Sequence, residues 1–126
     1  MKIECEISLG ELVDKISILR IKLQKISDPI KLIHVKKEEQ SLSQTLAALK
    51  LPDIDHRMNQ MIEVNSELWK IEDDIRDLER AQDFNQEFIK LARAVYFTND
   101  ERFKRKNSIN AEYSSGLIEV KSYKDY

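Results

Sequence analysis

The sequence predicts a mainly α-helical protein, with long antiparallel helices that form a bundle and a small two-stranded sheet made from the N- and C-terminal strands. Three observations support this prediction. Apolar residues recur at alternating steps of three and four in several long segments, which is the heptad pattern of packed or coiled-coil helices. Glycine and proline occur only twice each in 126 residues, so the connections are few and short. The N-terminal residues alternate between apolar and polar, as a half-buried strand does.

The two strands are expected at residues 1–7 and 117–123 of a single domain, 1–126. In the first, Met1, Ile3, Cys5 and Ile7 fall on one side. The second repeats the alternation over a shorter run. Because an isolated strand leaves backbone N–H and C=O groups without partners, we expect the two strands to pair on the surface of the helices.

The first two helices are expected at about 8–26 and 29–50. Ser8 and Glu11 form a capping box that opens the first helix. Asp28 precedes a proline at the first position of the second. Helix 8–26 is apolar on more than one side, so we expect it at the centre of the bundle or at a subunit interface.

Three further helices are expected at about 54–82, 84–97 and 100–113. The break between the last two depends on Thr98, Asn99 and Asp100, which are all favourable N-caps, and on a second capping box from Thr98 to Glu101. Three heptad seams in so short a chain leave apolar surface that one copy does not cover, so we expect a homodimer. The alternative is a monomeric antiparallel bundle that buries all three seams.

Composition and motifs exclude several classes of function. A net charge of −2 argues against a nucleic-acid binder, and no apolar run is long enough to span a membrane. No signal peptide is recognisable and the single cysteine cannot form an internal disulfide, so we expect a reducing cytoplasm. The phosphate-loop, nucleophile-elbow and zinc-protease motifs are all absent, and the two histidines lie far apart, so no metal site is predicted. Whether the chain is an enzyme stays open.

Two oppositely charged stretches are the main candidates for a site. Residues 63–79 are mostly acidic, and residues 90–106 are mostly basic. They can simply attract each other within the fold. Alternatively, free backbone N–H groups at the start of helix 100–113, with Arg102 and Lys106 one turn apart, would form a site for a phosphate or carboxylate. Asn110 lies beside the stripe that these two residues share.

Helix 54–82 carries a second stripe beside its apolar seam. Asn65, Trp69, Glu72 or Asp73, and Arg76 lie on it, and the tryptophan suggests that it is partly covered. A covered carboxylate and arginine would need each other or a ligand. The alternative is a solvated acidic face on which Glu72 and Arg76 form an i,i+4 ion pair.

The segments 10–22 (GELVDKISILRIK), 68–79 (LWKIEDDIRDLE), 88–110 (FIKLARAVYFTNDERFKRKNSIN) and 119–123 (EVKSY) resemble an uncharacterised family of bacterial and phage proteins of unknown function. Some members are associated with glycosyltransferase or surface-polysaccharide genes, which implies a sugar or nucleotide-sugar context. The likeness transfers no catalytic residue. It matches at polar positions, among them Asp14 and Lys15, which indicates either a ligand site or ion pairs that set the register of the helices.

We therefore expect a cytoplasmic, dimeric helical protein that binds an anionic small ligand, a phosphorylated sugar or a nucleotide, at a polar site between helices. Glu72 and Asp73 would orient Arg76 and Lys15, or hold Mg²⁺ if the ligand is a polyphosphate. The alternative is a non-catalytic interaction or scaffold module whose seams bind a partner helix. The predicted ligand-binding residues are Asp14, Lys15, Trp69, Glu72, Asp73, Arg76, Thr98, Asn99, Asp100, Arg102, Lys106 and Asn110.

Overall fold

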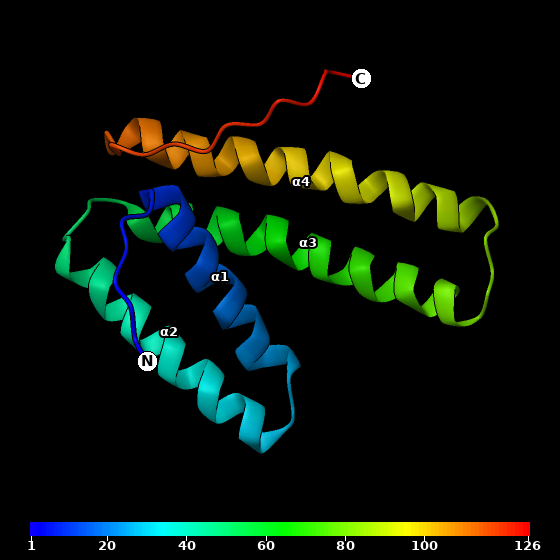
Figure 1. The fold of residues 1–126 in the computed structure, drawn as a ribbon, viewed down its shortest axis with the longest axis horizontal. Coiled ribbons are helices and arrows are strands. Elements are labelled where there is room, and N and C mark those ends of the chain that lie inside the picture. Colours follow the sequence, from blue (N-terminus) through cyan, green and yellow to red (C-terminus); the bar gives the residue numbers. More distant parts are fainter.

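The computed structural model describes residues 1–126 and contains four α-helices (Figure 1). They are α1 (Leu9–Lys25), α2 (Pro29–Ala48), α3 (Ile54–Arg80) and α4 (Gln86–Glu112). Helices α1 and α2 form one hairpin, and the longer α3 and α4 form another. In Figure 1 the two hairpins meet at one end and spread apart as a V. No helix has the length and apolarity needed to cross a membrane.

Local sequence explains where the first two helices begin. The Ser8 side chain accepts a hydrogen bond from the Glu11 N–H, and Asp28 accepts from the N–H groups of Ile30 and Lys31 ahead of the proline turn. The expected central position of helix 8–26 is confirmed, because α1 contacts α2, α3 and α4. Its apolar residues on several sides are the consequence of that position.

The core lies where the two hairpins meet. It consists of Leu12, Val13, Ile16, Leu46, Met58, Met61, Val64 and Ile109, all nearly or fully buried. Beyond it, α3 and α4 continue as a pair that α1 no longer covers. No residue from Trp69 to Arg105 is buried. We call residues 69–101 the distal hairpin.

The predicted two-stranded sheet is wrong. Residues 1–7 and 117–123 form no strand, although residues 5–7 and Leu117 line one hollow where the two segments begin to diverge. In Figure 1 the N-terminal segment passes beside the α1–α2 hairpin, whereas the C-terminal segment runs back along α4. Both segments are largely exposed, so water can satisfy their backbone groups and no ladder is required. Alternation alone therefore misled the prediction.

The predicted break at Thr98 is also wrong, because residues 86–112 form one continuous helix with Asn85 as its N-cap. The seam that faces the rest of the protein explains the difference. It steps by three or four from Phe88 through Val95 and Arg102 to Ile109 without losing phase. A helix whose packed face continues in register has no reason to stop at residues that are merely able to cap one.

Candidate functional site

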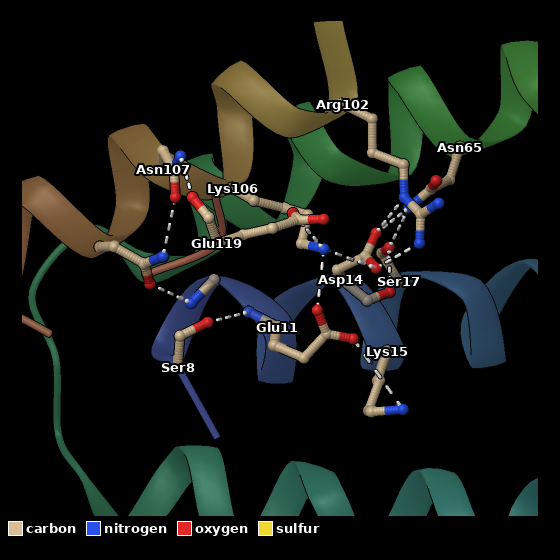
Figure 2. Close-up of polar contacts among 12 residues, drawn as sticks. Ser8, Glu11, Asp14, Lys15, Ser17, Asn65, Arg102, Lys106, Asn107 and Glu119 are labelled. Atoms are coloured by element: carbon tan, nitrogen blue, oxygen red, sulfur yellow. Dashed lines mark hydrogen bonds and ion pairs between the residues drawn. The ribbon is translucent and has the colours of Figure 1, made fainter. Parts of the chain in front are cut away.

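A charged cluster lies between α1 and α4 at the packed end of the molecule (Figure 2). We define it by its side chains. They are Glu11 and Asp14 on α1, Asn65 on α3, Arg102 and Lys106 on α4, and Glu119 on the C-terminal segment. Figure 2 shows these groups pointing toward one another from the facing elements.

Asp14 is the centre of the cluster and is fully buried. Its Oδ1 accepts from Arg102 Nε and from Asn65 Nδ2, both at 2.9 Å, and its Oδ2 accepts from Arg102 Nη2 at 2.5 Å. This bidentate pairing fixes the plane of the guanidinium. The hydrogen bonds to Asp14 raise the pKa of Arg102 by more than burial lowers it. Arg102 is thus a permanently charged and immobile group.

Lys106 is the more deeply buried base of the cluster, with 6% of its side chain exposed compared with 29% for Arg102. Its Nζ lies 2.8 Å from a carboxylate oxygen of Glu11 and 2.8 Å from one of Glu119, with Asp14 Oδ2 at 4.0 Å. Burial lowers the pKa of Lys106, but the ion-paired Glu11 and Glu119 raise it by more, so the pKa lies above its usual value. The two residues predicted to hold an external anion therefore already hold carboxylates of this chain.

Gly10 allows α1 and α4 to come this close. A Cβ at Gly10 would collide with the backbone oxygen of Lys106. In place of a side chain, the Gly10 N–H donates to Asn110 Oδ1 at 2.7 Å. Asn110, predicted as a ligand contact, is instead buried and holds the start of α1 against α4. The contact brings Glu11 and Asp14 level with Lys106 and Arg102.

A groove opens beside the cluster, where α1 leaves the α3–α4 pair. Its volume is about 460 Å³. The lining residues come from three helices and are Ile18, Ile21, Asn65, Leu68, Trp69, Glu72, Asp73, Arg76, Asn99 and Arg102. Six of the twelve predicted ligand-binding residues line it. The predicted i,i+4 pair is present, with Arg76 Nε 3.2 Å from Glu72 Oε2.

The remaining predicted site residues lie elsewhere. Lys15 is exposed and 4.0 Å from Glu11. Thr98 lies at a separate shallow hollow on α4, and Asp100 accepts a 2.5 Å hydrogen bond from the Tyr126 hydroxyl. Because these two lie inside α4, their N–H groups belong to the helix hydrogen-bond ladder, and the predicted free amides do not exist.

Sequence reasoning missed two carboxylates of the cluster. Glu11 was assigned to a capping box, but its carboxylate pairs with Lys106. Glu119 was placed in a strand. Both belong to segments that match the resembling family, in GELVDK and EVKSY, so the signal was present but was not connected to the bases. No group of three or more His, Cys, Asp or Glu side chains is arranged to hold a metal ion.

Comparison with known proteins gives a family but no activity. No curated protein and no solved structure matches the chain. A family model matches residues 1–126, the whole length given. The chain therefore belongs to the family of unknown function DUF6165.

Proposed function

We propose that the protein binds a small anionic ligand, a phosphorylated sugar or a nucleotide, in the groove between α1, α3 and α4. The observation that supports this most directly is the composition of the groove. It brings an indole, two guanidinium groups, two carboxylates and two carboxamides together over an apolar wall. Pockets that orient a small ligand combine an apolar surface with a few convergent polar groups in this way.

The anionic end of the ligand is assigned to Arg102 and Arg76. Arg102 lines the groove and uses Nε and Nη2 for Asp14, so its Nη1 has no partner in that ion pair. Arg76 is 70% exposed, and an exposed i,i+4 pair contributes little, so its guanidinium can leave Glu72 for a ligand at small cost. One arginine is fixed and the other is mobile.

The ring of the ligand is assigned to Trp69. Its indole is partly exposed on the groove wall, beside Leu68 and the α1 residues Ile18 and Ile21. A partly exposed indole offers a flat apolar face for a sugar or a base. The amides of Asn65 and Asn99 and the carboxylate of Asp73 lie on the same lining and suit hydroxyl groups. If the ligand is a polyphosphate, Glu72 and Asp73 could share Mg²⁺ with its phosphates.

The cellular setting is proposed from the sequence. The resemblance to bacterial and phage proteins associated with glycosyltransferase or surface-polysaccharide genes favours a phosphorylated sugar or a sugar nucleotide. The single cysteine favours the cytoplasm. Neither feature identifies a reaction, and the proposal is limited to binding.

Trp69 is the only tryptophan, so its fluorescence reports on the groove directly. We would titrate the protein with nucleotides, sugar nucleotides, sugar phosphates and pyrophosphate, with and without Mg²⁺. For a ligand that gives a saturable signal, Arg76→Ala is expected to weaken the affinity about tenfold or more, because it removes a charge-assisted contact. Arg80→Ala is the matched control, since Arg80 is equally exposed on the same helix and lies outside the groove. No saturable response to any ligand, or equal loss in both variants, would contradict the proposal.

A second candidate function, an interaction module that forms a homodimer, is favoured by the surface area. The chain exposes 9143 Å², whereas a compact monomer of 14.9 kDa is expected to expose about 7,000 Å². The extended termini contribute to the difference, as does the distal hairpin, where Phe84, Ile89 and Phe97 are each more than 40% exposed. A stable interface needs only about 800 Å² from each partner.

Light scattering on the purified chain tests this second candidate. A dimer mass that Ile89→Asp converts to a monomer mass would support it. A monomer mass at every protein concentration, including the high micromolar range in which weak interfaces associate, would contradict it.

A further inference from the structure

The C-terminal segment, residues 115–126, is fastened to α4 mainly by polar contacts. Asn107 Nδ2 donates to the backbone oxygen of Glu119 at 3.0 Å, and Lys121 Nζ lies over the Phe103 ring at 5.4 Å. Its large apolar and aromatic side chains are mostly exposed. Ile118 and Val120 are 65% and 79% exposed, and Tyr126 is 72% exposed although its ring meets those of Tyr96 and Phe97 on α4. Segments with few buried apolar contacts open locally at low free-energy cost. The segment can therefore leave α4 without unfolding the helices.

Glu119 is held in an unusual way. One of its oxygens, Oε2, is buried, and the Lys106 ammonium 2.8 Å away is its only polar partner. Buried carboxylate oxygens are normally fully hydrogen-bonded. Figure 2 shows the Glu119 carboxylate reaching from the segment to Lys106 across the end of the cluster. The charge is matched, but the fit is incomplete.

Two charges leave the site when the segment lifts, because Lys121 belongs to the segment as well as Glu119. Arg102 and Lys106 on α4 then face Asp14 and Glu11 on α1, so the charges stay balanced. Lys106 itself loses one of the two carboxylates that lie 2.8 Å from its Nζ, and no other carboxylate lines the hollow. An anion from outside can take that place beside Lys106 and Arg102.

We propose that the position of the Glu119 carboxylate is an anion site, which a phosphate or carboxylate from outside takes when the C-terminal segment lifts from α4. Glu119 is thus a tethered competitor of that anion. A phosphate offers several oxygens in place of the one buried carboxylate oxygen of Glu119, so it can accept from both Lys106 and Arg102.

This anion site extends the proposed function, and it rests on the proposed function where the groove and the hollow at Glu119 share residues. Asn99 and Arg102 line both the groove and the hollow behind Glu119. A ligand whose ring lies against Trp69 can therefore extend its phosphate past Arg102 toward Lys106. The C-terminal segment then sets the affinity, because ligand binding must displace Glu119.

The test is a calorimetric titration of the full chain with inorganic phosphate and with pyrophosphate. Glu119→Gln keeps the size of the side chain and removes the competing charge, so we expect about tenfold tighter binding than for the natural chain. Asp125→Asn removes a charge from the same segment outside the cluster and should bind like the natural chain. Glu119→Asp retains the charge and should not show the full gain. Thermal melts establish that each variant is folded, and Lys106 keeps Glu11 as a partner in all of them.

Hydrogen exchange on the natural chain gives a second readout. Phosphate should speed exchange of the amides in residues 117–124 while it leaves α4 protected. Tighter binding by Glu119→Gln together with faster exchange supports the inference. Equal phosphate affinity in all variants, with unchanged hydrogen exchange, overturns the inference. If Trp69 still responds to groove ligands in that case, the proposed function stands without it. If no variant binds phosphate or pyrophosphate and Trp69 responds to no groove ligand, both the inference and the proposed function are overturned.

Discussion

The two ends of the α3–α4 pair have the same sequence pattern and very different surroundings. At the packed end, α1 lies against both helices, and Val64 and Ile109 are completely or almost completely buried. In the distal hairpin the same three-and-four spacing continues through Ile75 on α3 and Val95 on α4, yet neither is fully buried. The difference comes from a third helix and not from the seam. A heptad seam predicts which face of a helix is covered, whereas tertiary contacts determine how deeply that face is buried.

The polar groups follow the same division. Four charged or amide side chains are buried in the chain, and all of them lie where α1 meets α3 and α4: Asp14, Asn65, Lys106 and Asn110. In the distal hairpin the ion pairs are exposed and local, such as Lys70 with Asp74. Charges there keep their water, while charges at the packed end depend on one another.

The largest effect is expected at Asp14. Asp14→Asn leaves the partly buried Arg102 guanidinium beside a neutral amide and should lower the free energy of unfolding by about 3–5 kcal/mol, as breaking a buried pair does. Urea unfolding measures it. Asp73→Asn, on the exposed side of α3, is the control and should stay within about 0.5 kcal/mol of the natural chain. Similar losses at both positions would remove the contrast between the two ends.

Two isoleucines on α4 test the apolar side of the comparison. Ile109 is 1% exposed and Ile89 is 47% exposed. Ile109→Ala should cost about 2–5 kcal/mol of unfolding free energy through the cavity it leaves. Ile89→Ala should cost less than about 0.5 kcal/mol in the isolated chain. A large loss at Ile89 that depends on protein concentration would instead show that a second copy covers the distal hairpin.

The two glycines provide a smaller and independent test. Gly10→Ala forces a Cβ against the Lys106 backbone oxygen and should destabilise by about 1–3 kcal/mol. Helix propensity alone would give the opposite sign, because alanine is the better helix former. Gly116→Ala meets no atom within 4 Å and should change the melting temperature little. A stabilised Gly10→Ala variant would show that α1 and α4 are farther apart than described.

The smallest effect concerns the contact between the C-terminal segment and α4. The hydrogen bond to Asp100 raises the pKa of Tyr126 to about 12, compared with about 10 for a free tyrosine. The neutral phenol is the bonded form, so the contact is fully present below pH of about 10 and is lost as the pH rises through the raised value. Ultraviolet absorbance of the phenolate follows this titration. Asp100→Asn should return the Tyr126 pKa toward its usual value, and an unchanged titration would mean that the contact is absent in solution.

Much of the fold could be predicted from local signals. Ser8 and Asp28 mark the starts of α1 and α2, and the apolar residues on several sides of helix 9–25 indicated a central position. These features depend on side chains within one or two turns. The termini could not be predicted in the same way, because alternation at residues 1–7 is compatible with an exposed segment, and pairing is a choice between distant parts of the chain.

The site was predicted in part for a similar reason. Trp69, Glu72, Asp73 and Arg76 share one helix, so spacing placed them together, and the groove contains all four. The partners of Arg102 and Lys106 are distant in sequence, and composition showed only that bases and acids were available. Thr98 misled because a residue that can cap a helix can also continue one when the packed face stays in phase.

The bond between Asp14 and Arg102 joins residues 88 positions apart. Each hairpin can form from near neighbours, but this bond must wait until α4 has been made, because closing so long a loop costs entropy that local contacts do not repay. During synthesis, α1 therefore emerges well before Arg102 and Lys106, the bases that pair with Asp14 and Glu11. A chain interrupted in α4 would retain two acidic residues on an apolar helix, the kind of surface that chaperones and proteases act upon.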